Sequence, residues 1–153
     1  MRVGVLADTH NLLRPRVLEL LAGCDRILHA GDVGAPEILE QLRQAAPRAA
    51  LAAIRGNTDT GATAAALPET LAGDLDGLPF GMVHRREDMD RAWPARMRLV
   101  VFGHSHRPEL EWQSSCLLLN PGACGPRRFQ LPLTIAILRV VDGRIVPEIL
   151  AVE

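Results

Sequence analysis

Seven residues of this chain have side chains that commonly bind metal ions, and each lies at or shortly after the end of a short apolar run. Carboxylate, amide and imidazole groups suit hard-to-borderline divalent ions such as Mn²⁺, Fe²⁺, Ni²⁺ or Zn²⁺. No cysteine belongs to the set, which argues against a structural zinc site. The sequence therefore predicts a metal centre. Its candidate ligands are Asp8, His10, Asp32, Asn57, His84, His104 and His106.

Five apolar runs must position these side chains, and each is predicted to be a buried strand bounded by turn residues. Where strands run parallel, their carboxyl ends share one edge of the sheet, and ligands bind in the crevice beyond that edge. We therefore expect all seven side chains to converge on one site. The runs are residues 3–7, 27–30, 49–54, 80–83 and 99–102.

The spacing of the candidate ligands adds to this expectation. Asp8 and His10 are two positions apart, as are His104 and His106, and such positions point the same way in an extended chain. Glycine directly precedes three of the seven, at positions 31, 56 and 103. Glycine tolerates unusual backbone dihedrals, and its lack of a side chain lets the backbone approach an ion closely.

The first half of the chain alternates strands with helices. A helix is predicted from Pro15 to position 21, ending at Gly23, and a second from Pro36 to position 42, ending before Pro47. Residues 61–67 are alanine-rich and fit either a helix or a loop. This alternation predicts parallel strands joined by right-handed crossovers.

The second half is richer in strands. Residues 69–75 and 78–83 flank Asp76-Gly77, which predicts a hairpin, and Asp142-Gly143 marks another. Residues 88–95 are expected to form a short helix disturbed by Pro94, and Trp93 and Trp112 are assigned to packing. We expect two packed sheets with helices on their outer faces. The remaining predicted strands are residues 109–112, 116–119, 131–140 and 144–150.

Length and composition are those of a single globular domain over residues 1–153. The chain is 48% hydrophobic and 23% charged, and its length lets roughly two-thirds of the unfolded surface be buried. The net charge of −1 gives no overall electrostatic reason to bind nucleic acid or membranes. The basic track that a nuclease needs beside its active site is therefore not expected.

Compartment is inferred from the cysteines and the apolar runs. Cys24, Cys116 and Cys124 lack the CxxC spacing of redox or zinc motifs and are expected to be buried thiols. Asp8 interrupts the N-terminal apolar run too early for a signal peptide, and no run approaches the roughly 18 to 20 residues of a membrane helix. We expect a cytoplasmic protein.

The ordered motifs of this chain resemble those of the calcineurin-like metallophosphoesterase superfamily, over residues 3 to 125. The absence of a cap and the Asn120-Pro121-Gly122 segment are most similar to its small bacterial and archaeal phosphodiesterase branch. The resemblance implies an α/β fold, a four-layer αββα sandwich of two mixed β-sheets flanked by helices, with two metal ions. Its motifs are Asp8-Thr9-His10, Gly31-Asp32, Gly56-Asn57-Thr58-Asp59, His84 and Gly103-His104-Ser105-His106.

The resemblance also implies how the ligands divide. Asp8, His10 and His106 would hold one ion, Asn57, His84 and His104 would hold the other, and Asp32 would bridge them. Manganese is the expected metal, with nickel, iron, zinc and magnesium as alternatives. The implied reaction is in-line attack on a phosphate ester by a metal-bridging hydroxide. Asp32, Asn57 and His84 are the expected catalytic residues.

Two positions depart from the pattern of the superfamily. Thr58 stands where many of its phosphatases carry a histidine that helps the leaving group, which predicts phosphodiester substrates with leaving groups that need little protonation. Arg85 replaces a common glycine and, with Asn11 and Thr58, is a candidate contact to a small phosphoester substrate. The roles of Asp59, His29 and Arg127 stay open.

The main alternative is a non-catalytic metal-binding scaffold on the same fold, similar to the small retromer subunit of eukaryotic cells. Such scaffolds typically lose metal-binding histidines, whereas this chain keeps the complete set. We therefore favour an enzyme. The physiological substrate and the oligomeric state stay open, with a homodimer as one option.

Overall fold

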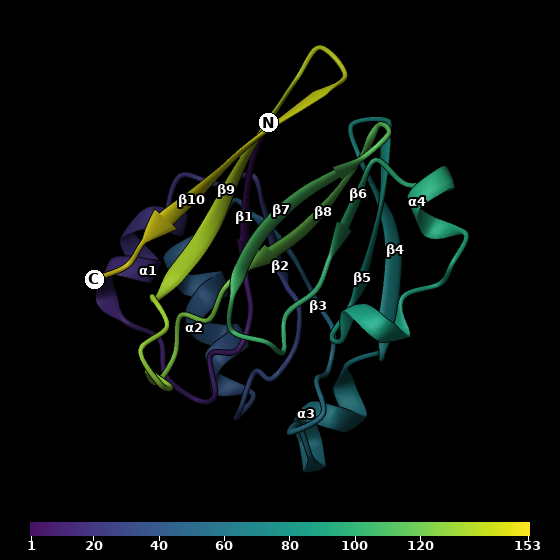
Figure 1. Cartoon of the computed structure of the whole chain (residues 1–153). Helices are drawn as coiled ribbons and strands as arrows, with labels where there is room; N and C mark the ends of the chain where they lie inside the picture. Colours follow the sequence, from purple (N-terminus) through teal and green to yellow (C-terminus); the bar gives the residue numbers. More distant parts are fainter.

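Two mixed five-stranded sheets form the centre of the computed structural model, which describes residues 1–153. The first sheet has the order β10-β9-β1-β2-β3, in which β1 pairs with β2, and β2 with β3, in parallel. Figure 1 shows β9 and β10 as the edge hairpin of this sheet. Its strands are β1 (Arg2–Leu6), β2 (Arg26–His29), β3 (Ala50–Ala53), β9 (Thr134–Val141) and β10 (Arg144–Ala151).

The second sheet has the order β4-β5-β6-β8-β7. Its three middle strands run parallel, while β4 and β7 pair antiparallel at the edges. The predicted hairpin around residues 76–77 is the β4–β5 turn. The strands are β4 (Thr70–Leu75), β5 (Leu78–Val83), β6 (Leu99–Val101), β7 (Pro108–Gln113) and β8 (Cys116–Pro121).

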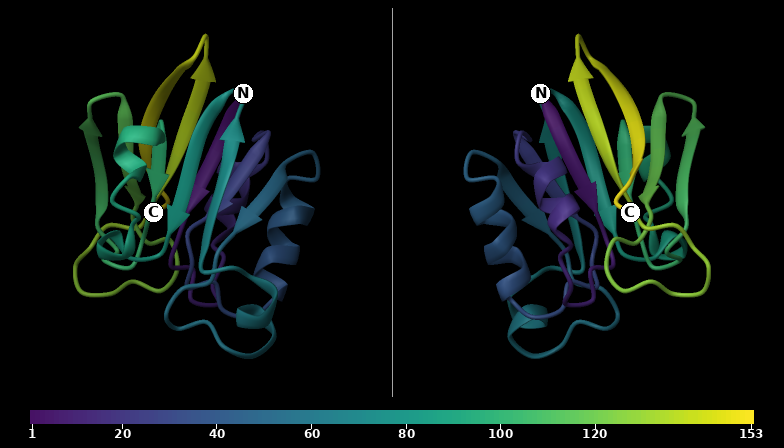
Figure 2. Two further views of the ribbon diagram at one scale, coloured as in Figure 1. Left: turned by 90° about the vertical axis from the view of Figure 1, so that its right-hand side faces the viewer. Right: turned by 90° about the vertical axis from the view of Figure 1, so that its left-hand side faces the viewer.

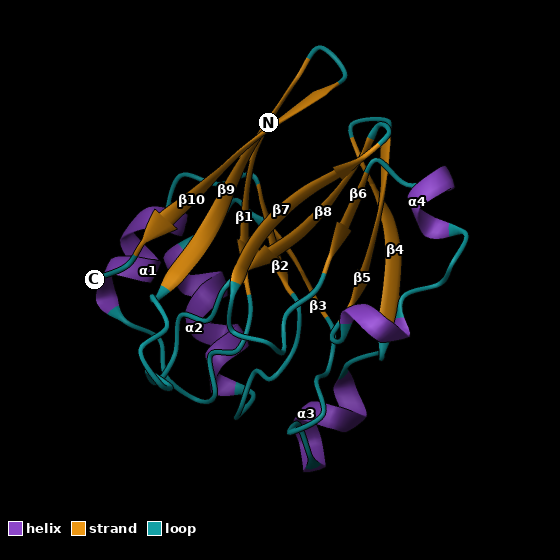
Figure 3. Ribbon diagram, viewed as in Figure 1, coloured by secondary structure: helices purple, strands orange, loops and turns teal.

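Helices are few and short, as Figure 3 shows in purple. None of the four α-helices combines the length and apolar character that a membrane crossing demands. The alanine-rich segment, for which the sequence left helix or loop open, is a helix. The helices are α1 (Pro15–Leu21), α2 (Glu37–Ala45), α3 (Gly61–Ala66) and α4 (Trp93–Arg96), and a 3₁₀ turn covers Arg86–Asp88.

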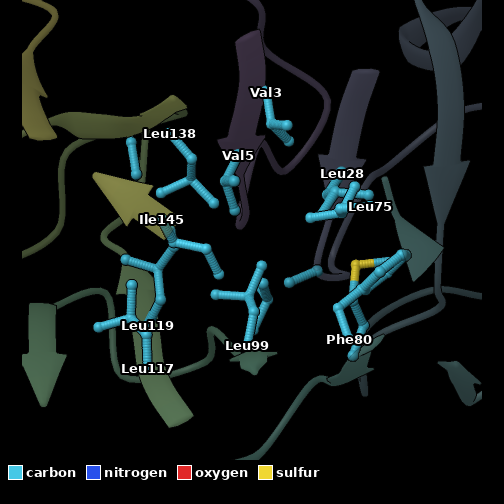
Figure 4. Close-up of a cluster of buried hydrophobic side chains, with 14 of the residues drawn as sticks. Val3, Val5, Leu28, Leu75, Phe80, Leu99, Leu117, Leu119, Leu138 and Ile145 are labelled. Atoms are coloured by element: carbon cyan, nitrogen blue, oxygen red, sulfur yellow. The ribbon is translucent and has the colours of Figure 1, made fainter. Parts of the chain in front are cut away.

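The central core lies between the two sheets. Strand alternation sends Val3 and Val5 of β1 inward, where they meet side chains such as Leu99 of β6 and Leu117 of β8 (Figure 4). The other face of β1 carries Leu6, which packs with side chains of α1 and α2. This arrangement confirms the predicted layers on the side of the first sheet.

The outer face of the second sheet has a thinner cover. Trp93 and Met97 of the α4 region pack against a cluster that includes Val100 and Phe102. Together the layers make the four-layer αββα sandwich, seen from two sides in Figure 2. Trp112 does not pack as expected, because it lies on the edge strand β7 and is 50% exposed.

Three predicted boundaries were wrong. The helix expected over residues 88–95 is replaced by the separate 3₁₀ turn and α4, which begins at Trp93 and has Pro94 in its first turn, a position that proline favours rather than disturbs. Pro36 is the N-cap of α2 rather than a residue of its first turn. The strand expected from residue 131 begins only at Thr134, whose backbone N–H donates to the Ala123 carbonyl.

Candidate metal centre

The structure brings six of the seven predicted ligands into two groups at the carboxyl ends of the parallel strands. In each group, one ligand atom per residue lies within 4.8 Å of the others, close enough to share an ion. The seventh, Asn57, accompanies the second group, because its Oδ1 lies 3.0 Å from His104 Nδ1. The first group is Asp8, His10 and His106, and the second is Asp32, His84 and His104.

Asp8 aims one carboxylate oxygen at three imidazoles. Its Oδ1 lies 3.8 Å from His10 Nε2, 3.8 Å from His84 Nε2 and 3.5 Å from His106 Nε2. These separations exceed hydrogen-bond lengths. Two atoms that each bind the same ion at about 2.1 Å lie roughly 3 to 4 Å from each other. The observed oxygen–nitrogen distances fall in this range.

The donor atoms also lack other partners. Asp8 Oδ1, His10 Nε2 and His84 Nε2 are buried and make no hydrogen bond. A buried polar group without a partner costs about 1 to 3 kcal/mol, more if charged. A cation among these atoms removes that cost, so the donor set fits divalent metal ions.

Asp32 connects the two groups. Its Oδ2 lies 3.6 Å from His10 Nε2 of the first group and 3.2 Å from His84 Nε2 of the second. Its Oδ1 accepts a hydrogen bond from the Thr58 backbone N–H at 2.9 Å. Burial opposes ionisation, yet the His84 ring 3.2 Å away and the hydrogen bond from the Thr58 N–H hold the pKa of the Asp32 carboxyl well below its usual range. The carboxylate is therefore ionised and held between the groups.

A backbone carbonyl orients His84. Its Nδ1–H donates to the Ala30 carbonyl oxygen at 2.8 Å, which leaves the Nε2 lone pair facing the carboxylates. Burial acts against a charged ring, but Asp32, the Ala30 carbonyl and Asp8 outweigh it and raise the pKa of His84. The surroundings of this nitrogen thus favour a positive charge, which a metal ion supplies as well as a proton does.

The ligands themselves adopt left-handed backbone conformations. The φ angle is positive at Asp8 (55°), His10 (42°), Asp32 (54°), His104 (71°) and His106 (62°). Such conformations cost of order 1 kcal/mol or more for a residue with a side chain, and they concentrate at functional sites. The fold therefore keeps five unfavourable backbone conformations at the positions where they orient candidate ligands.

The glycines that precede three of the ligands mainly allow neighbouring groups to approach the backbone closely. Gly31 has the positive φ that the sequence suggested, at 102°. At Gly56, a Cβ would lie 2.1 Å from Asp32 Oδ1, and at Gly103 a Cβ would lie 2.8 Å from Asp8 Oδ2. Those two positions are therefore glycine because ligand carboxylates fill the space of a side chain.

A buried network behind the ligands explains His29. Thr9 Oγ1 donates to the Val33 carbonyl at 2.7 Å and receives the His29 Nε2–H at 3.0 Å, while the Gly31 N–H lies 3.2 Å from His29 Nδ1. This pattern requires a neutral ring, and burial lowers the pKa of His29 to about 4. His29 therefore ties the loop of Asp8 to the loop of Asp32.

Asp59 also holds loops together. Its carboxylate accepts the backbone N–H groups of Val33, Gly34 and Gly56 at 3.1, 3.0 and 2.9 Å. These bonds join the loop of Asp32 to the loop of Asn57. Asp59 is thus a brace for the ligand loops and does not reach the two groups.

Sequence reasoning missed one functional residue, Asn120. Its Nδ2 donates to the Gly103 carbonyl at 3.0 Å and to Ser105 Oγ at 3.1 Å, which fixes the turn that carries two of the histidines. The signal was present, because the apolar run 116–119 ends at Asn120 as the ligand-bearing runs end at theirs.

The predicted substrate contacts have different surroundings. Asn11 uses its Oδ1 to accept the Ala35 N–H at 3.0 Å, so its side chain shapes the loop. Thr58 is exposed beside Asp32, and Arg85 lines a cavity next to His84. Arg127 pairs with Glu153 and the Leu131 carbonyl and is not free to meet a substrate.

Comparison with known proteins gives this architecture its class. Residues 1–143 match the calcineurin-like phosphoesterase superfamily domain, and the chain belongs to this family. Its fold and its two clusters of histidine and aspartate are those of the metallophosphoesterases, a class of hydrolases of phosphoester bonds.

Individual relatives cover nearly the whole chain. A probable metallophosphoesterase of Methanocaldococcus jannaschii is 28% identical over 100% of this chain and 82% of its own length. A structure of an archaeal phosphodiesterase superposes with a TM-score of 0.81 at 21% identity, covering 98% of this chain and all of that one. The structure of wild-type Vps29 of Entamoeba histolytica in complex with Zn²⁺ superposes with a TM-score of 0.73 at 22% identity, and both chains are fully covered. At these identities the structures establish the fold alone.

Proposed function

We propose that this protein is a dinuclear metal-dependent phosphodiesterase. The observation that carries the proposal is the position of Asp32, whose Oδ2 lies within 3.6 Å of an imidazole nitrogen from each group. A carboxylate in that position can bind two ions at once. In this arrangement Asp8, His10 and His106 would hold one ion, Asn57, His84 and His104 would hold the other, and Asp32 would be shared between them.

Two divalent ions, manganese in our proposal, lower the pKa of a bound water and neutralise charge on the phosphate during an in-line displacement. The chain's own residues fix the ligands before substrate arrives. His84 is oriented by the Ala30 carbonyl, and Asp32 is held by the Thr58 N–H. Asp32, Asn57 and His84 are the catalytic residues of this proposal, and ligands fixed in advance need little reorganisation during the chemical step.

The presence of threonine at position 58 supports the proposal that the substrates are diesters with good leaving groups. Its side chain is exposed next to Asp32, and a hydroxyl does not donate a proton readily near neutral pH. His29, the one histidine outside the two groups, is fully buried and engaged with Thr9. No histidine of the chain is thus left free to protonate a poor leaving group.

A scaffold remains the second candidate because Vps29 shares the fold. One of its structures is a complex with Zn²⁺, so metal binding by itself does not distinguish the two functions. Hydrolysis does.

The proposal is tested with protein stripped of metal and then resupplied with Mn²⁺. We expect no hydrolysis without metal, and with Mn²⁺ a value of kcat/KM about tenfold or more higher for bis(p-nitrophenyl) phosphate than for p-nitrophenyl phosphate. Ni²⁺, Fe²⁺, Zn²⁺ and Mg²⁺ are compared in parallel. Folded, metal-loaded protein that hydrolyses neither compound with any ion would favour the scaffold, and a preference for the monoester would overturn the diester assignment.

A further inference from the structure

A cavity opens beside the second group of ligands. It has a volume of about 320 Å³ and shares Asn57 and His84 with that group. Its size is at the lower end of small-molecule sites, so it suits one part of a substrate rather than a nucleic-acid duplex. A phosphate held at the metal centre would therefore have one substituent directed toward this cavity.

Eight of the nine residues that line the cavity are polar or glycine, and Val83 is the one hydrophobic residue. Thr70 and Asp88 also line it, and they can accept hydrogen bonds from hydroxyl groups.

Two arginines line the cavity, and they differ in what holds them. Arg55 donates to the Leu67 carbonyl at 2.7 Å and pairs with Glu69 at 3.6 Å, so its charge is already compensated. Arg85 is half-buried and its guanidinium makes neither a hydrogen bond nor an ion pair. A guanidinium in this state is ready for a bidentate anion such as phosphate.

We infer that this cavity binds a second phosphate group carried by the alcohol substituent of the substrate, and that Arg85 recognises it. The inference rests on the proposed function, since it names the substrate class of the same site: phosphodiesters of a hydroxylated, phosphate-bearing alcohol. Arg85 is then a specificity-determining residue that leaves the scissile phosphate to the metal centre.

The test uses two chromogenic diesters that differ in one remote phosphate, the p-nitrophenyl ester of thymidine 5′-phosphate with and without a 3′-phosphate. For the Mn²⁺-loaded wild type, we expect kcat/KM to be about tenfold or more higher with the 3′-phosphate. Arg85→Ala should bring this ratio close to one. A wild-type ratio near one, or a ratio that Arg85→Ala leaves unchanged, would overturn the inference.

Arg107→Ala is the matched control, because Arg107 also follows a candidate ligand and is exposed, but does not line the cavity. It should keep the wild-type ratio, and if it lowers the ratio as much as Arg85→Ala does, general electrostatics rather than the cavity is responsible.

A binding measurement separates this inference from the proposed function. Calorimetry on metal-loaded protein should show tighter binding of thymidine 3′,5′-bisphosphate than of thymidine 5′-phosphate, with the preference lost in Arg85→Ala. Should the wild type hydrolyse neither diester, the phosphodiesterase proposal fails, yet this preference would still support the cavity. Equal affinities in the wild type would reject the cavity whatever the activity.

Discussion

Replacing Asp32 with asparagine is expected to lower kcat/KM for bis(p-nitrophenyl) phosphate by about a thousandfold or more. The amide oxygen can still accept the Thr58 N–H that Oδ1 accepts at 2.9 Å, so the loop keeps its shape. The amide NH₂ then faces His10 and His84 in place of the anionic Oδ2, and the bridge between the two groups is lost.

Stability of the metal-free protein should fall as well. Asp8 and Asp32 both lie within 3.8 Å of His10 Nε2, so metal-free protein holds two buried carboxylates close together. The His84 ring and the Thr58 N–H outweigh this repulsion, because they hold the pKa of Asp32 below its usual range, so we expect metal-free Asp32→Asn to unfold below the wild-type temperature at neutral pH. Asp74→Asn is the control, because Asp74 caps the exposed β4–β5 turn through Gly77. An Asp32→Asn enzyme within tenfold of wild type would refute the bridging role.

Gly56→Ala is expected to damage both activity and stability. The added Cβ would lie 2.4 Å from the Asp32 backbone nitrogen and 2.1 Å from its Oδ1, distances that cannot be relieved by a side-chain rotation alone. The loops of Asp32 and Asn57 must separate. We expect a loss of about 1 to 3 kcal/mol in the free energy of unfolding and about a hundredfold or more in kcat/KM.

Gly23→Ala serves as the control for this substitution. A Cβ at Gly23 meets no atom within 4 Å, so its effect on unfolding should stay within about 0.5 kcal/mol, with activity unchanged. Urea unfolding and kcat/KM are measured on both variants. If Gly56→Ala resembles Gly23→Ala in both measurements, the close approach to Asp32 does not organise the site.

Much of the fold was predictable because strand signals are local. Four of the five predicted runs are buried at every position, and the aspartate-glycine pairs make the expected turns. The prediction of a buried strand over residues 49–54 was wrong, because β3 lies at the edge of its sheet and only Ala53 and Ile54 of this run are buried. The cover of the second sheet was harder to predict, because α4 has four residues and its position depends on tertiary packing of Trp93 and Met97.

The prediction that ligands two positions apart point the same way in an extended chain was wrong. His104 and His106 were expected to point the same way, yet they fall into different groups. Both have positive φ angles, so the chain there is not extended and strand alternation does not apply. Asp8 and His10 do share a group, but they too have positive φ angles. Backbone conformations that residues with side chains rarely adopt leave little trace in sequence.

The structure gathers Asp8, His10 and His106 in one group, and His84 and His104 with Asp32 in the other, while the division of ligands between two ions stays a prediction. Asp59 and His29, whose roles the sequence left open, are explained only by partners distant in the chain, such as Val33 and Thr9. Long-range backbone hydrogen bonds of this kind have no local sequence signal.

A titration of metal-stripped protein with Mn²⁺, followed by the rate of bis(p-nitrophenyl) phosphate hydrolysis, tests the dinuclear centre most directly. If both groups hold an ion and Asp32 joins them, activity should rise to its maximum at two equivalents per chain and stay low below one if the sites fill in sequence. Full activity at one equivalent, or activity that needs no metal, would contradict a two-ion site.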